Sequence, residues 1–181
     1  YCYNASFPTL CSAGKGYADF IIWENKRFVE QFILDGFYHD NVFCISCGKS
    51  NHNHPAGEFW PMLATREMYK RHYAMLKSLG RETLIIMHTA PKIAPILAYA
   101  DAVLEGERYS YLLKDHYPDV LPLDTFRTGF MGRQWGYSPM FLPMIGAPTA
   151  SGKVIEQIEP SRCLMAMLMI HDVTPWIQWC N

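Results

Sequence analysis

Apolar residues along this chain alternate between the period of a helix and the period of a strand. From Gly16 to Phe32 they recur three or four positions apart, which predicts a helix with one apolar face. The segment Gly36 to Asp40 follows, apolar at its start and polar at its end, and predicts a short strand. The regular pattern therefore opens with one helix-to-strand step.

The alternation continues along the next part of the chain. The apolar stripe from Met62 to Leu79 predicts a second helix, with Gly80 as its stop signal. Thr83 to His88 is a continuous apolar run, which is typical of a strand covered on both faces. A short helix is expected from Pro91 to Tyr99 and a brief strand from Ala102 to Leu104. Strands that alternate with helices favour a parallel sheet with right-handed crossovers.

The remaining segments give weaker patterns. We expect a helix from Asp124 to Trp135 with Asp124 as its N-cap, a strand from Met140 to Ile145 and a helix from Ser161 to Ile170. Residues 41–60 are rich in turn formers and too long for a simple connector, so they are expected to form a functional loop. Neither a repeat nor a linker divides the sequence, so we expect residues 1–181 to form one domain.

The length and composition of the chain limit the size of its fold. The 181 residues are 50% hydrophobic and 14% aromatic, which is enough to bury a core. A complete (β/α)8 barrel needs about 250 residues, so a barrel here would be partial and truncated on its N-terminal side. The chain opens without a Met or a signal-peptide pattern. Its compartment stays open, with a secreted or periplasmic location as the option that we keep.

Charge and cysteine content exclude several classes of protein. Sixteen basic residues face 17 acidic ones without a basic run, so we expect no nucleic-acid partner. The apolar stretch Cys163 to Ile170 is far shorter than a membrane span, so no membrane partner is expected either. Six cysteines are too sparse for a disulfide scaffold, and the ten methionines show no cofactor pattern. We therefore predict no cofactor.

Three predicted strands end in polar residues, and these residues are the catalytic candidates. Asp40 follows the first strand, His88 ends the next, and Glu105 and Glu107 follow the third. Parallel folds place such strand ends at one edge, where carboxylates from two strands can face one cleft. Hydrolysis of a glycosidic bond needs such a pair, with one group ionised and the other a proton donor. Purely structural alternatives are an Asx turn at Asp40 and an exposed loop at the two glutamates.

Other polar and aromatic residues could orient a sugar. These residues flank the predicted strand ends or offer an aromatic face for stacking on a pyranose ring. The substrate-binding candidates are His39, Asn41, His88, Asp101, Arg108 and Trp135.

The long loop offers a different chemistry. Cys44, Cys47, His52 and His54 supply four possible ligands within eleven residues, and such a set can hold tetrahedral zinc. A disulfide, two free thiols or histidines that contact substrate are the alternatives. We keep this loop as a second, metal-dependent hypothesis and assign no metal in the leading one.

Several segments resemble known barrel glycosidases. The run Leu34 to Asp40 resembles the fourth-strand DGxxxD segment of the α-galactosidase-like group. Further segments are similar to bacterial proteins described as glycoside hydrolase family 123-like: Pro61 to Glu67, Met87 to Thr89, Ala100 to Glu107, Leu121 to Arg127 and Phe130 to Gly136. This resemblance covers about residues 30 to 145 and implies the C-terminal part of a TIM-type barrel. Family 123 enzymes use an adjacent Asp-Glu pair, which this sequence lacks at its strand ends.

The leading hypothesis is a glycosidase with a carbohydrate substrate. Asp40 would be the nucleophile or electrostatic stabiliser, and Glu105 or Glu107 the general acid/base. A carbohydrate-binding barrel without chemistry is one alternative, and a metal-dependent hydrolase that uses the cysteine-histidine loop is another.

Overall fold

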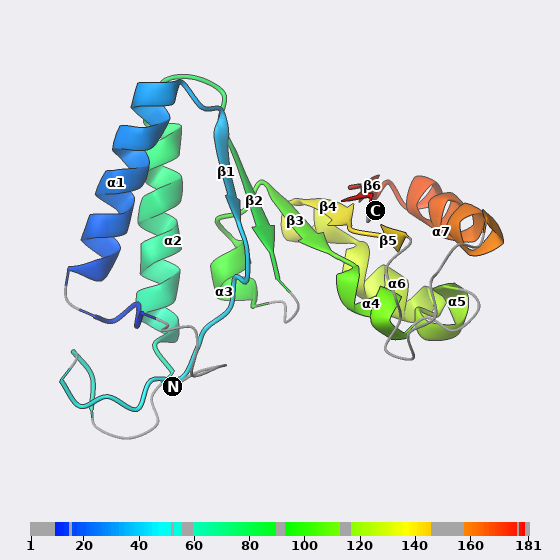
Figure 1. Ribbon diagram of the computed structural model, residues 1–181, viewed down its shortest axis with the longest axis horizontal. Coiled ribbons are helices and arrows are strands. Elements are labelled where there is room, and N and C mark those ends of the chain that lie inside the picture. The colour runs from blue at the N-terminus through cyan, green and yellow to red at the C-terminus, as the bar shows by residue number, and fades with distance from the viewer. Residues whose placement is uncertain are drawn as a thin grey trace. The chain divides into compact units, whose positions relative to one another are not determined.

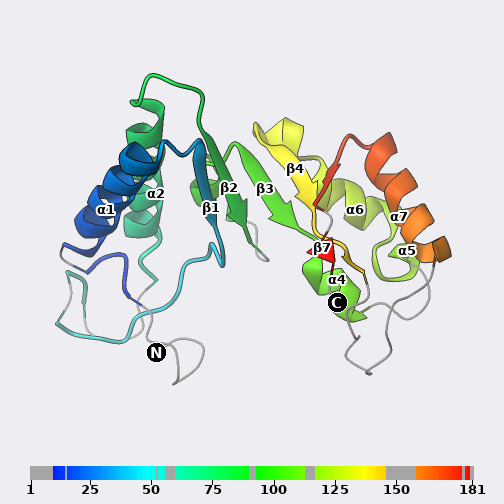
Figure 2. The same cartoon turned by 45° about the horizontal axis from the view of Figure 1, so that its top comes forward.

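The computed structural model describes residues 10–14, 16–51, 53–55, 60–89, 93–112, 117–145, 158–176 and 178–179 (Figures 1 and 2). The chain divides into two compact units, which are described one at a time. The N-terminal unit comprises Tyr1–Tyr38, Val42–Ile85 and Pro91–Ala100. The C-terminal unit comprises His39–Asn41, Ile86–Ala90 and Asp101–Asn181.

Helices and strands alternate over most of the described chain. The helices are α1 (Tyr17–Phe32), α2 (Met62–Lys77), α3 (Ala94–Leu97), α4 (Glu107–Leu112), α5 (Tyr117–Val120), α6 (Leu123–Phe130), the 3₁₀ turn η1 (Gly132–Trp135) and α7 (Ile158–Ile170). The strands are β1 (Gly36–His39), β2 (Leu84–His88), β3 (Ala102–Glu105), β4 (Ser138–Phe141), β5 (Met144–Ile145), β6 (Thr174–Pro175) and β7 (Gln178–Trp179).

Within the described residues, five strands form a parallel sheet in the order β1-β2-β3-β4-β6, and β5 pairs with β7. Ile86 of β2 lies opposite Ala102 of β3, and Leu104 of β3 lies opposite Met140 of β4. All four residues of β3 are buried, which explains its uninterrupted apolar pattern. The prediction that the strands at residues 37–39, 84–87 and 102–104 are parallel neighbours is confirmed, and so is the α/β class.

The N-terminal unit places α1 and α2 side by side (Figures 1 and 2). α2 buries Thr65, His72 and Leu76 of its predicted stripe, and also Met75, which the stripe did not include. Val29 is the buried residue of α1, where much of the predicted apolar face stays exposed. Arg81 donates to the carbonyl oxygens of Leu34 (2.7 Å) and Val29 (3.2 Å), which satisfies acceptors at the end of α1.

Gly36 explains part of the sequence motif at the start of β1. A Cβ atom at this position would lie 1.8 Å from the carbonyl oxygen of Leu84 in β2. The amide of Leu84 in turn donates to the carbonyl of Asp35 over 2.8 Å. Glycine is therefore required because the two backbones approach each other closely here.

The C-terminal unit has an aromatic core. Phe130 lies 5.1 Å from Phe126 and 5.0 Å from Phe141, measured between ring centroids. Tyr109 and Tyr117 also pack against Phe141. The buried cluster is completed by aliphatic residues from α7 and its neighbours, namely Leu121, Leu164, Leu168 and Val173.

Three sequence expectations need correction in this unit. Asp124 lies in the first turn of α6, whose N-cap is Pro122, so its carboxylate faces the helix dipole without capping the helix. That helix ends at Phe130 and does not reach Trp135. The strand expected from Met140 to Ile145 is two strands, because Pro143 has no N–H group with which to continue the ladder.

None of the helices in the described ranges has the length and apolar character that a membrane crossing requires.

Candidate functional site

Polar side chains gather at the carboxyl ends of β1, β2 and β3. Asp40 follows β1, His88 ends β2, and Glu105 ends β3, with Glu107 at the start of α4. Parallel strands bring their carboxyl ends to the same edge of a sheet. All four residues belong to the C-terminal unit.

The Asp40 carboxylate is held in one orientation. Asn41 donates its backbone N–H to Oδ1 (2.9 Å) and its side-chain amide to Oδ2 (3.0 Å). His88 Nδ1 lies 2.9 Å from the same Oδ1 atom. Asn41 has a φ of 52°, a left-handed conformation that asparagine adopts more readily than most residues. Because the Asp40 side chain is 55% exposed, the fixed carboxylate is also open to solvent.

His88 lies between two carboxylates. Its Nδ1 contacts Asp40, and its Nε2 lies 3.7 Å from Oε2 of Glu107. When Nδ1 carries the proton that is donated to Asp40, the lone pair of Nε2 faces Glu107. The ring is only 16% exposed, whereas the Glu107 side chain is 36% exposed. We name the residues Asp40, His88 and Glu107 the strand-end triad.

Glu105 has different surroundings from Glu107. Its side chain is 4% exposed, and its Oε1 lies 2.7 Å from a guanidinium nitrogen of Arg108. Burial, with the charge of Glu105 as a second cause, raises the pKa of Tyr137 above its ordinary value. Arg108 also donates to the Tyr109 hydroxyl over 2.7 Å. Glu105 is therefore a buried carboxylate paired with the half-exposed Arg108, and Glu107 is the glutamate that faces His88.

The other sequence-predicted substrate contacts do not all meet at this edge. Asn41 supports Asp40, and His39 is largely buried beside it, where burial lowers its pKa to about 4. Asp101 precedes β3, and its carbonyl accepts the amide of Ser138 at the start of β4. Trp135 is exposed and also precedes β4. Because parallel strands run in one direction, these last two residues lie toward the amino ends, away from the triad.

A surface hollow of about 360 Å³ lies next to Arg108. It is lined by Arg108, Tyr109, Asp124, Thr125, Thr128 and Gly129. Asp40, His88 and Glu107 are not part of this lining.

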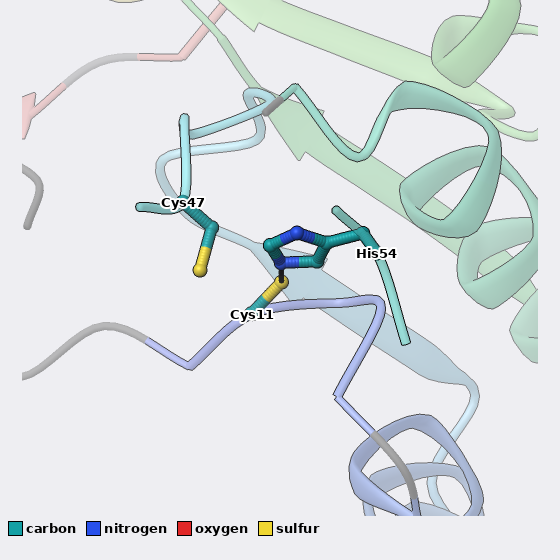
Figure 3. Close-up of side chains that lie close together, drawn as sticks. All are labelled: Cys11, Cys47 and His54. Carbon is teal, nitrogen blue, oxygen red and sulfur yellow. Dashed lines mark hydrogen bonds between the residues drawn. The ribbon is translucent and has the colours of Figure 1, made fainter. Parts of the chain in front are cut away.

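The cysteine-histidine loop is brought together differently from the sequence expectation. Cys47 and His54 meet Cys11, which lies before α1, and the three ligand atoms are all within 4.8 Å of one another (Figure 3). Cys44 lies elsewhere in the core, 3.9 Å from the hydroxyl of Thr65. His52 lies outside the described residues. The structure therefore replaces Cys44 with Cys11 in the candidate ligand set.

Two residues near these sites were missed by the sequence analysis. Cys11 carries no local motif, since Cys47, its nearest partner in the structure, is 36 positions away along the chain, and only the total cysteine count hinted at it. Tyr137 was overlooked because nothing in the sequence near Gly136 indicates proximity to Glu105.

Comparison with protein-family models, with curated proteins and with solved structures finds no match for this chain.

Proposed function

We propose that this chain is a glycoside hydrolase that uses Asp40 and Glu107 as its two carboxylates. The observation that carries the proposal is the strand-end triad, in which one imidazole separates two solvent-accessible carboxylates at the carboxyl edge of a parallel sheet. Buried Glu105, paired with Arg108, is left to a structural role.

The spacing of the carboxylates favours the inverting reaction. The His88 ring lies between the two carboxylates, 2.9 Å from Asp40 Oδ1 and 3.7 Å from Glu107 Oε2. This arrangement suits the separation of about 6.5–9.5 Å between the carboxyl groups of inverting enzymes better than the about 5–5.5 Å of retaining ones. Asp40 would take a proton from water while the water oxygen bonds to the anomeric carbon. Glu107 would donate a proton to the departing glycosidic oxygen as its bond to carbon breaks.

The fold supports the same proposal. The strands of the five-stranded sheet follow one another in chain order, β1-β2-β3-β4-β6. This order lacks the reversal that is found in doubly wound folds. We infer that the sheet is a consecutive part of a (β/α)8 barrel, in which further strands would be needed for closure. Barrel enzymes place their sites at the carboxyl ends of the strands, where the triad lies.

The test is hydrolysis of a panel of aryl glycosides by the wild-type chain and single variants. Asp40→Asn should lower kcat at least about 100-fold for every substrate that the wild type cleaves, because the base is lost. Glu107→Gln should lower kcat strongly for alkyl glycosides but weakly for dinitrophenyl glycosides, whose leaving group needs no proton. Glu82→Gln, at an exposed carboxylate of the N-terminal unit, is the control and should leave kcat unchanged.

Two outcomes would contradict the proposal. If Asp40→Asn turned over as fast as the wild type, the triad would not be catalytic. If the wild type bound oligosaccharides in calorimetry but cleaved none of them, the chain would be a carbohydrate-binding module instead.

A further inference from the structure

Three soft or borderline metal ligands converge in the N-terminal unit, which contains no member of the triad. Cys11 lies before α1, and Cys47 and His54 lie in the loop between β1 and α2 (Figure 3). Their two sulfur atoms and one imidazole nitrogen all lie within 4.8 Å of one another. Side chains from two distant segments of the chain therefore point at one small volume.

The distances suit a tetrahedral ion. With Zn–S bonds of about 2.3 Å and Zn–N bonds of about 2.0 Å, ligand atoms lie roughly 3.5–3.8 Å apart. Cys11 Sγ and His54 Nε2 are 3.8 Å apart, so this edge is already close to its final length. The longest separation in the set requires a contraction of only about 1 Å.

The second nitrogen of His54 is fixed in the way that metal-binding histidines require. Nδ1 donates to the backbone carbonyl of Pro55 over 2.8 Å. This bond places the proton on Nδ1 and leaves the Nε2 lone pair directed toward Cys11. Metal-ligating histidines commonly make this outer contact, because it sets both the tautomer and the ring orientation.

The thiols also favour a cation. Two neighbouring thiolates, on Cys11 and Cys47, would repel each other because both carry a negative charge. A divalent cation between the two sulfurs removes that repulsion and allows both to ionise.

We propose that Cys11, Cys47 and His54 bind one Zn²⁺ ion, which ties the segment before α1 to the loop that follows β1. Two thiolates and one imidazole select zinc over magnesium or calcium, which prefer oxygen ligands. Water or a further side chain takes the fourth position. The ion stabilises the long loop and has no part in the chemistry of the triad.

The structure also separates this site from the Cys44-x-x-Cys47 motif. Cys44 is buried and next to Thr65, whereas Cys47 faces Cys11 and His54. Cys44→Ala is therefore a matched control, since it removes a thiol from the same loop but not from the ligand set.

The experiment measures metal binding by the reduced chain. Competition against a chromophoric chelator should give one Zn²⁺ per chain, and Co²⁺ should produce a thiolate charge-transfer band and the visible bands of tetrahedral coordination. Cys11→Ser and Cys47→Ser should each weaken Zn²⁺ binding by on the order of 100-fold and reduce the charge-transfer band. His54→Ala should weaken binding but keep the band, and Cys44→Ala should behave as the wild type. Circular dichroism of each variant checks that it is folded.

Three results would overturn the proposal. The first is no zinc binding by the folded, reduced wild type. The second is loss of binding in Cys44→Ala while Cys11→Ser binds normally, which would assign the site to the motif. The third is a Cys11–Cys47 disulfide, detected by mass spectrometry as a loss of two hydrogens in chain isolated with zinc present.

Discussion

His39 and His88 end neighbouring strands but have opposite surroundings. His88 has a carboxylate on each side, which makes it part of a polar site. His39 is largely buried, and the loss of hydration lowers its pKa from 6.5 to about 4. Neutral His39 therefore belongs to the folded state, and its protonation opposes folding.

This burial predicts a pH dependence of stability. The pKa of His39 is lower in the folded state than in the unfolded state, so the unfolded state binds more protons between about pH 4 and 6.5. The contribution of neutral His39 to the free energy of unfolding is complete above pH 6.5 and is lost as the pH falls toward 4. Between pH 7 and 5, urea unfolding of the wild type should lose about 1–2 kcal/mol more than that of His39→Phe, which cannot titrate. Equal losses would contradict the assignment.

Single residues of the site were predictable only where their position along a strand decided their role. Asp40 and His88 were found because each ends a strand, and the structure places them 2.9 Å apart. Glu105 and Glu107 could not be separated, because one is the last buried residue of β3 and the other opens α4. Asp101 was chosen as a substrate contact although the predicted strand begins after it, and the structure accordingly places it at the amino end of β3.

At the scale of elements, β1 and β2 are held so close together that their backbones leave no room for a side chain at Gly36. The added Cβ at Gly36 would meet the carbonyl oxygen of Leu84, and a backbone atom cannot rotate away as a flexible side chain can. The two strands must separate to accept any side chain there.

Gly36→Ala should therefore lower the free energy of unfolding by more than about 2 kcal/mol, although alanine favours ordered structure over glycine. Gly48→Ala is the control within the same unit, because an added Cβ there has nothing within 4 Å. Denaturant unfolding of both variants measures the effect. A Gly36→Ala protein as stable as Gly48→Ala would show that the strands are not as close as described.

Helices and long apolar strands followed from the sequence because their periods are strong. α1, α2, β2 and β3 begin and end within a few residues of the expected bounds. β4 and β5 were merged because the apolar pattern passes through Leu142 and Pro143 without a break, although the two strands belong to different sheets. The N-cap of α6 was misassigned because Asp is equally favourable one turn into a helix.

At the scale of the whole molecule, apolar surface is unevenly distributed. α1 and its C-cap expose Phe20, Trp23, Phe28, Phe32 and Ile33 by more than half. Parallel pairing was predictable from the alternation of elements, whereas the division into two compact units was not, because no linker marks it. A contiguous exposed apolar face favours association in solution.

The isolated chain should therefore self-associate. Light scattering after size exclusion should give an apparent mass above 20.9 kDa that rises with concentration. Replacing Phe28 and Phe32 together by Ser should reduce this rise, since their rings lie 4.7 Å apart on α1. Leu63→Ser, at an 80% exposed position of α2, should leave it unchanged. A chain that stays monomeric at all concentrations would contradict this prediction.

The two hydrogen bonds from Asn41 restrict the rotamers of the Asp40 side chain already in the folded protein. Both carboxylate oxygens are already engaged, by the backbone and side chain of one neighbour. The rotamer entropy of this aspartate is thus given up during folding, before any ligand arrives. A ligand that binds at the strand ends therefore meets a carboxylate that is already fixed. Binding does not have to immobilise this side chain, so less of the binding free energy is offset by lost side-chain entropy.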